Sequence, residues 1–137
     1  MSAASNYLEG ELLDHVLRGA SGAWTAPTTL YVGLFVNTSG NAATNLEAGT
    51  LTDEVSGGSY VRKTITFNAA SSGTSASAAT VTFDAATANW GTVTHVAILD
   101  ASTSGNVLFW GAVTTAKTIE TGDTFQITAG SLTISLA

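Results

Sequence analysis

The sequence predicts a mainly β protein, a single β-sandwich or jelly-roll-like domain of about eight strands preceded by one N-terminal helix. Short apolar, β-branched runs recur at regular spacing along most of the chain, and Gly-containing turns separate them. Only residues 6–18 place their apolar side chains at helical spacing. With 137 residues, the chain is long enough to bury the core of one domain.

Residues 6–18 predict the helix. Asn6 is a good N-cap with Glu9 in the capping-box position, and Gly19 supplies a left-handed residue at the C-terminal end. One apolar stripe consists of Leu8, Leu12, Leu13, Val16 and Leu17. Because Gly10 costs the helix about 1 kcal/mol relative to Ala, we expect this stripe to pack on something. The two alternatives are one end of the β-core and a neighbouring subunit.

The chain as a whole divides into an N-terminal helical arm with its linker and a β-domain. We expect residues 1–28 to form a helical arm with its linker and residues 29–137 to form the β-domain. The strongest hairpin signal lies in residues 89–113, where two β-branched runs flank a small polar loop. Simple alternation puts four residues of its first strand on one face: Val93, His95, Ala97 and Leu99. The expected core residues are Trp90, His95, Phe109 and Trp110.

Further strands are predicted on both sides of this hairpin. They cover residues 29–36, 60–67, 80–83, 124–128 and 132–136, with a short strand at Ile119. Residues 114–118 are expected to turn the chain, and residues 68–78 to form a spacer. Residues 37–54 are polar and have no periodicity, and a loop of this length in a compact domain is usually functional or mobile.

The composition excludes several classes of function. Only 10% of the residues are charged, against roughly 25% in an ordinary domain. Such a surface suits burial by copies of the chain or by a partner, and it also suits an extracellular β-protein. A net charge of −6 with four basic residues leaves no footprint for nucleic acid. We expect no membrane span, no signal peptide and folding in the cytoplasm.

No arrangement of residues indicates an enzyme, a cofactor site or a catalytic residue. Only His15 and His95 are available as histidines, Cys is absent, and no metal-ligand cluster is visible. Turn carboxylates leave a calcium site open as an alternative. Carbohydrate binding is the other alternative, because aromatic rings on a β-sandwich can stack on sugars. The candidate rings are Trp24, Tyr31, Tyr60, Trp90 and Trp110.

Several segments resemble, in the same order, a group of small tailed-bacteriophage virion proteins that are often labelled tail fibre proteins. These segments are SNYLE at residues 5–9 with His15 and Arg18-Gly19, YVGLF at 31–35, EVSGGSYVR at 54–62, ANWGTVTH at 88–95, and KT at 117–118 followed by TGDTF at 121–125. The resemblance extends over residues 5–136 and is weakest in residues 37–53. It implies a virion component and brings no catalytic residue.

The resemblance leaves the position in the virion open. Because the chain lacks a repetitive shaft, its plan is closest to capsid decoration (cement) proteins, which are commonly trimeric. We therefore expect a homotrimer that binds the major capsid protein and stabilises the head lattice. The alternative is a tail or tail-fibre module that contacts tail proteins and binds a carbohydrate receptor. The candidate assembly surface consists of Tyr7, Leu8, Leu12, Val16, Arg18, Glu47, Asp53 and Glu54.

Overall fold

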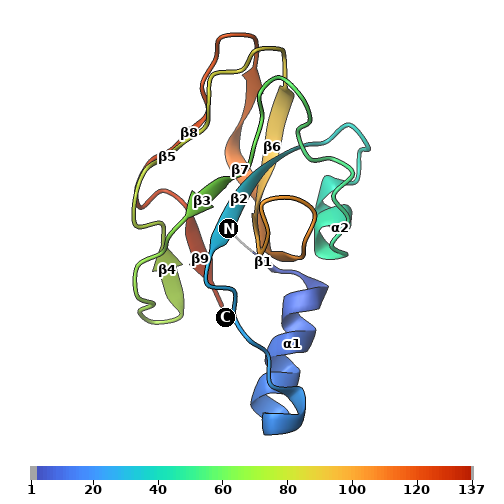
Figure 1. The fold of residues 1–137 in the computed structure, drawn as a ribbon, viewed down its shortest axis with the longest axis vertical. Coiled ribbons are helices and arrows are strands. Elements are labelled where there is room, and N and C mark those ends of the chain that lie inside the picture. The colour runs from blue at the N-terminus through green and yellow to red at the C-terminus, as the bar shows by residue number, and fades with distance from the viewer. Residues whose placement is uncertain (1–2, 137) are drawn as a thin grey trace.

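A computed structural model describes residues 3–136. It is mainly β with a helix near the N-terminus (Figure 1), which confirms the predicted fold class. The elements are β1 (Ala3–Ala4), α1 (Asn6–Leu17), the 3-10 helix η1 (Gly19–Gly22), β2 (Leu30–Val36), α2 (Ala42–Glu47), β3 (Lys63–Ile65), β4 (Thr74–Ala76), β5 (Val81–Thr82), β6 (Gly91–Leu99), β7 (Val107–Ile119), β8 (Gln126–Ile127) and β9 (Thr133–Ser135).

One antiparallel sheet of five strands, in the order β1-β7-β6-β2-β3, forms the larger layer. The predicted hairpin is present as β6 and β7 and lies inside this sheet. The predicted turn at residues 114–118 is wrong, because β7 continues to Ile119. Thr118 faces Thr92 on β6, and their hydroxyl oxygens lie 2.8 Å apart. Pairing with β6 thus keeps residues 114–118 in the extended conformation of β7.

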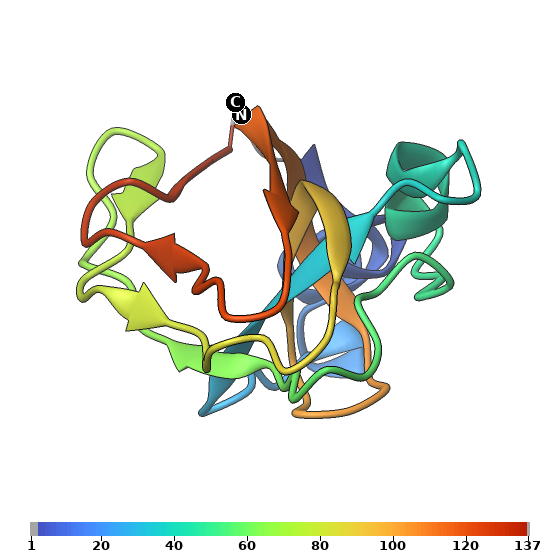
Figure 2. The same cartoon turned by 90° about the horizontal axis from the view of Figure 1, so that it is seen from above.

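Two short sheets, β4-β9 and β5-β8, lie on one side of the large sheet and α2 lies on the other (Figure 2). The main core fills the space between the large sheet and the short strands. The large sheet and the residues next to it contribute buried side chains to this core: Val32, Leu34, Trp90, Val93, Val96 and Ile98. The segments around β5 and β8, on the other side of the core, contribute Val81, Phe83, Phe125 and Ile127. A sandwich-like packing of two layers follows from this arrangement.

A β-bulge changes the faces that alternation predicts for β6. The register shifts between Val93 and His95, so Val93 joins the main core together with Val96. Ala97 and Leu99 remain on the opposite face, under α2. The predicted grouping of Val93 with these two residues is therefore wrong, because the bulge inserts one residue into the period of two.

Three other expectations about secondary structure were wrong. The strand predicted for residues 60–67 is reduced to β3, and the spacer at residues 68–78 contains β4. Phe67 makes only an isolated bridge to Ser77, so the chain leaves the large sheet at this point. The loop at residues 37–54 contains α2. Its six residues are too few for a convincing helical period in the sequence.

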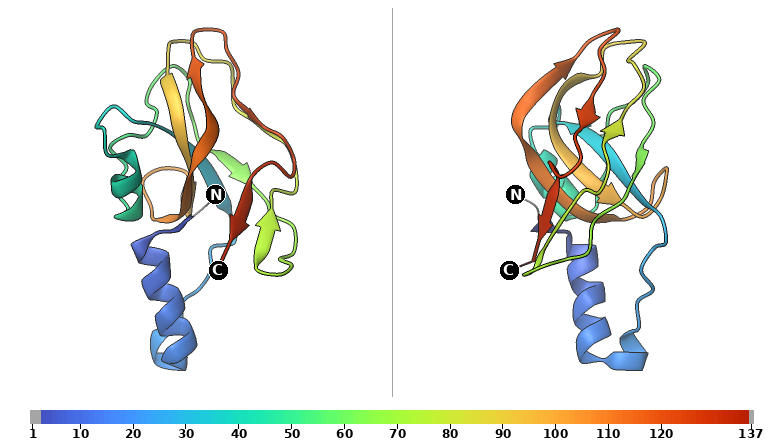
Figure 3. Two further views of the ribbon diagram at one scale, coloured as in Figure 1. Left: turned by 180° about the vertical axis from the view of Figure 1, so that it is seen from behind. Right: turned by 90° about the vertical axis from the view of Figure 1, so that its left-hand side faces the viewer.

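The helix α1 projects from the β-domain, with its long axis pointing away from the strands (Figures 1 and 3). Its N-cap is Ser5 and not Asn6: the Ser5 hydroxyl accepts a hydrogen bond from the Leu8 N–H at 3.3 Å. The same hydroxyl donates to the carbonyl of Val107, and the Ser5 N–H donates to Leu108. This cap therefore also fixes the helix to β7. Gly19 follows Arg18 with φ +56°, as predicted.

Candidate assembly surface

The apolar stripe of α1 is largely uncovered within the chain. Leu8, at the β-domain end, is 2% exposed, but Leu13, Val16 and Leu17 are 59%, 73% and 76% exposed. We call these last three residues the exposed stripe. The alternative in which the stripe covers one end of the β-core does not account for Leu13, Val16 and Leu17, because these three side chains are exposed. Of the two alternatives, the surface for another subunit is the one this geometry favours.

The linker after α1 covers a different face of the helix. The Trp24 indole N–H donates to the Tyr7 hydroxyl at 3.3 Å, and the Trp24 backbone N–H donates to His15 Nδ1 at 3.1 Å. Gly22 approaches the backbone of Asp14 so closely that a Cβ would lie 2.4 Å from its carbonyl oxygen. The arm is therefore a helix held by its own linker, with the exposed stripe left free.

Five of the predicted assembly residues lie on α1 or at its end, on different faces. Tyr7 and Leu12 are half-buried, Leu8 is buried, and Val16 and Arg18 are exposed. Arg18 pairs with Asp14 at 3.1 Å across one helical turn. The candidate list omitted Leu13 and Leu17, which share a face with Val16. Their spacing relative to Val16 is the signal that would have found them.

Asp53, predicted to belong to the assembly surface, is only 2% exposed. Its carboxylate accepts hydrogen bonds from the backbone N–H (2.9 Å) and hydroxyl (2.6 Å) of Ser39, from the Asn45 amide (3.0 Å) and from the Thr38 hydroxyl (3.3 Å). These bonds, chiefly from the Ser39 hydroxyl, lower the pKa of Asp53. We call this group the Asp53 network. It holds the loop that carries α2 in place.

We expect the substitution Asp53→Asn to lower the free energy of unfolding by about 1–3 kcal/mol at neutral pH, because an amide cannot accept all of these donors. The lowered pKa means that the network contributes fully above the ordinary value of 3.8 and is lost as the pH falls through the lower folded-state pKa. The variant should therefore lose less stability than the parent on acidification. Urea unfolding followed by tryptophan fluorescence over a pH series measures both effects.

The control for this prediction is Asp84→Asn. Asp84 pairs with Lys63 at 3.0 Å, but its side chain is 62% exposed, so its loss should change stability by no more than about 0.5 kcal/mol. If Asp53→Asn matched Asp84→Asn in both stability and pH dependence, the structural role assigned to the Asp53 network would be wrong.

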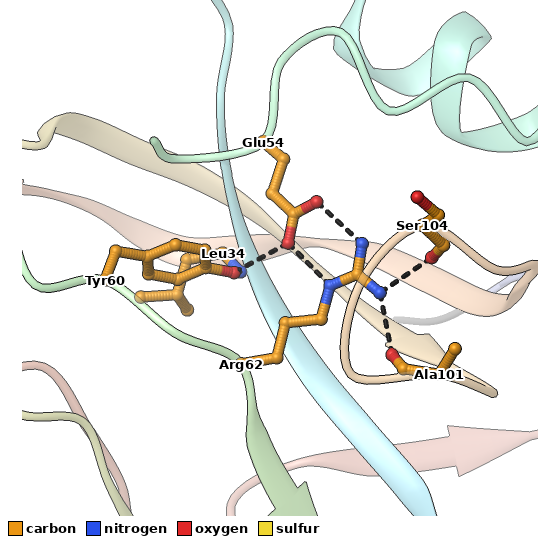
Figure 4. Close-up of polar contacts among 6 residues, drawn as sticks. All are labelled: Leu34, Glu54, Tyr60, Arg62, Ala101 and Ser104. Atoms are coloured by element: carbon orange, nitrogen blue, oxygen red, sulfur yellow. Dashed lines mark hydrogen bonds and ion pairs between the residues drawn. The ribbon is translucent and has the colours of Figure 1, made fainter. Parts of the chain in front are cut away.

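Glu54 and Arg62 form a nearly buried ion pair whose side chains are 17% and 2% exposed. Arg62 Nε and Nη2 donate to the two Glu54 carboxylate oxygens at 2.6 and 2.7 Å (Figure 4). Arg62 Nη1 donates to the carbonyls of Ala101 and Ser104 at 2.7 and 2.8 Å. We call this arrangement the Arg62 clamp. It ties the loop before β3 to the β6–β7 turn, a role that no sequence signal indicated.

Tyr60 extends the Arg62 clamp to the large sheet. Its hydroxyl donates to Glu54 Oε1 at 3.0 Å and accepts the Leu34 N–H at 2.9 Å (Figure 4). Burial raises the pKa of Tyr60, with the Glu54 charge as a further cause, so the hydroxyl keeps the proton that it donates. Both carboxylate oxygens of Glu54 therefore accept hydrogen bonds from within the chain, and this side chain is not free to bind a partner.

Glu47, the third predicted acidic assembly residue, accepts a hydrogen bond from the Trp110 indole N–H at 2.7 Å. This bond holds α2 against β7.

Of the four predicted core residues, Trp90 is buried, whereas His95, Phe109 and Trp110 are half-buried. His95 lies beside Trp110, with 6.2 Å between ring centroids, and burial lowers its pKa. These residues hold the β-domain together at two different faces of the sheet.

Residues 3–136 bear on the ligand sites that the sequence left open, and one groove of about 250 Å³ lies beside the Arg62 clamp. Across residues 3–136, no three His, Cys, Asp or Glu side chains come together as a metal site. A groove of about 270 Å³ between β7 and the β8–β9 segment has no charged residue in its lining. None of the five aromatic candidates for sugar stacking is fully exposed. No helix within the described chain has the length and apolarity to cross a membrane.

Comparison with known proteins decides the family. A protein-family model described as podophage GP4 fiber I protein gp80 matches residues 3–135. The chain belongs to this family. No curated protein matches it. The resemblance to phage virion proteins is thereby confirmed, and this member of the fibre family is a fibre-type structural protein of a bacteriophage.

Proposed function

We propose that this fibre-family protein is a non-enzymatic component of the phage tail, in which the β-domain, with β1 in its large sheet, is a rigid body and α1 with its linker (residues 6–28) forms an assembly arm. The family match over residues 3–135 carries the proposal, because the family's description names a fibre. The structure supports the role of the arm: α1 projects from the domain and presents the exposed stripe. Its partners in this role are other virion proteins.

Capsid decoration is the second candidate. It is favoured by the compact β-domain and by the absence of a repetitive shaft among residues 3–136. In that role the protein would bind the major capsid protein at many equivalent positions, with avidity compensating for weak single contacts. Both roles place the protein in the virion, and they differ in where it is found there.

Cryo-electron microscopy of whole particles separates the two candidates. We expect density for the β-domain at the tail, with α1 visible as a rod about 18 Å long, given its 12 residues at about 1.5 Å each. Antibody fragments against the purified protein would mark the same position independently. Density confined to the head shell would overturn the tail proposal in favour of decoration.

The role of the arm is tested by Val16→Asp. A charge on the exposed stripe should leave the isolated protein folded, because Val16 is 73% exposed, but it should reduce the number of copies per particle severalfold. Thr44→Asp on the exposed side of α2 is the matched control and should be incorporated normally. Quantitative mass spectrometry of purified particles gives the copy number. Equal incorporation of both variants would contradict an assembly role for α1.

A further inference from the structure

The groove between β7 and the β8–β9 segment lies beside a strand edge that no described strand covers. On this side of β7, the carbonyl of Leu108 accepts a hydrogen bond from the Ser5 N–H, and Trp110 is paired with Ala3 of β1. Backbone groups alternate in direction along a strand, so Ala112 directs its N–H and C=O to this same side. Among the described residues, none forms a backbone hydrogen bond with Ala112 there.

The strand β9 supplies a second edge, because its sheet contains only β4 and β9. The carbonyl of Leu132, just before β9, accepts a hydrogen bond from the Ser77 N–H, just after β4. The same alternation therefore turns the backbone groups of Thr133 away from β4. Both Thr133 and Ala112 line the groove. The groove is thus a gap between two strand edges, each with backbone groups available for hydrogen bonding.

The floor of this groove is apolar. Val113, Leu132 and Ile134 line it, are partly buried and pack against the main core. No charged residue lies in the lining, and Lys117, the charged residue of β7, lies outside it. Natural sheets usually protect their free edges with charged residues or proline, but residues 111–114 contain neither. The chemistry of the groove therefore favours an uncharged polypeptide that can pair as a strand.

We propose that this groove receives an extended, uncharged segment of another virion protein, which adds as a strand between β7 and β9. This inference rests on the proposed function as a virion component. Hydrogen bonds to the backbones of Ala112 and Thr133 would hold the segment, as in other cases of strand addition. An apolar side chain that points inward would cover Val113 and Leu132, which the chain itself leaves partly exposed.

A strand from another protein fits the groove better than a strand from a second copy. Each of the strands β1–β9 is already paired within its own chain, so a second copy would have to give up one of its own pairings. The linker after α1 is held to the helix through Trp24, and Pro27 lacks a backbone N–H. At about 270 Å³, the groove is also smaller than the roughly 300–1,000 Å³ of a typical small-molecule site.

The proposed contact is short. The register of β7 with β6 breaks after Ala112 and resumes at Lys117, so the regular part of the free edge that lines the groove covers few residues. Few backbone hydrogen bonds can form there, and a single contact is weak in dilute solution. In a virion, where the two proteins are held close together by other contacts, the same pairing is effectively intramolecular and becomes much stronger.

Hydrogen–deuterium exchange of the free protein and of purified particles, read by mass spectrometry, tests the proposal. The amides of Ala112 and Thr133 should exchange about tenfold more slowly in the particle, because the added strand accepts their protons. The β6–β7 turn at residues 102–105, which lies outside the groove, is the internal control and should change little. Protection at the two strand edges no greater than at this turn would overturn the proposal.

A proline at position 112 tests the backbone contact. Ala112→Pro removes the outward N–H at an edge position, where sheets tolerate proline. The free variant should therefore keep the circular dichroism of the parent, while its copy number per particle falls severalfold. Ala112→Val is the matched control, because it keeps the N–H and changes only an exposed side chain. Equal incorporation of both variants would contradict strand addition, and the exchange measurement holds even if the proline variant does not fold.

The source of the added strand is tested by the density around the groove. Cryo-electron microscopy of the particle should show an extended segment between β7 and β9 that traces to a different virion protein. An empty groove, or a segment that traces to a second copy of this chain, would overturn the proposal. These results do not depend on where in the particle the protein lies, so strand addition can fail while the tail position stands.

Discussion

Arg62→Ala is expected to lower the free energy of unfolding by about 3–5 kcal/mol. The substitution leaves the Glu54 carboxylate, 17% exposed, without its cation. It also removes the donor shared by the carbonyls of Ala101 and Ser104. The loop before β3 and the β6–β7 turn would then lose their common attachment. Urea unfolding followed by tryptophan fluorescence measures the loss.

Two controls separate the buried clamp from ordinary surface charge. Arg18→Ala removes an ion pair whose side chains are 59% and 51% exposed and should cost at most about 1 kcal/mol. The double substitution Glu54→Gln with Arg62→Met should be less harmful than Arg62→Ala alone, because no unpaired charge remains in it. If Arg62→Ala cost no more than Arg18→Ala, the clamp would be unimportant for stability.

The sequence predicted the fold class well because the central strands alternate or are apolar on both faces. The β6–β7 hairpin and β2 were identified from that pattern alone. Local chemistry was less predictable. Asn6 and Ser5 are both good caps, and the sequence could not show that Ser5 also bonds to β7. The bulge beside Val93 depends on pairing across the sheet and has no local signal.

The candidate site was predicted only in part. The acidic residues at positions 47, 53 and 54 looked available to a partner because polar loop residues are usually solvated. In the folded chain, the loop returns to the sheet, and each carboxylate accepts hydrogen bonds from its own domain. The exposed stripe, in contrast, was recognisable as apolar from helical spacing. That spacing cannot show whether such a stripe faces the core of its own chain or another molecule.

Trp90 is the anchor of the main core, and we expect Trp90→Ala to lower the free energy of unfolding by about 3–5 kcal/mol. The ring is 6% exposed. It packs edge-on against Tyr60 and Phe83, with centroid distances of 5.5 and 6.4 Å. Its indole N–H donates to the carbonyl of Gly58 at 2.9 Å. Removal leaves a cavity between the layers and takes one of two donors from the Gly58 carbonyl, which keeps its hydrogen bond from the Thr87 N–H at 3.1 Å.

Gly58 makes this packing possible, because it adopts φ +59° and a Cβ there would lie 2.8 Å from the indole nitrogen of Trp90. Trp90→Phe keeps most of the ring volume but loses the hydrogen bond, so it should cost about 1–2 kcal/mol. Trp24→Ala is the matched control: Trp24 packs on the arm, and its loss should leave unfolding of the β-domain nearly unchanged. Equal destabilisation by Trp24→Ala and Trp90→Ala would mean that the arm and the β-domain unfold together. It would then no longer be justified to treat the β-domain as a rigid body that carries a separate assembly arm.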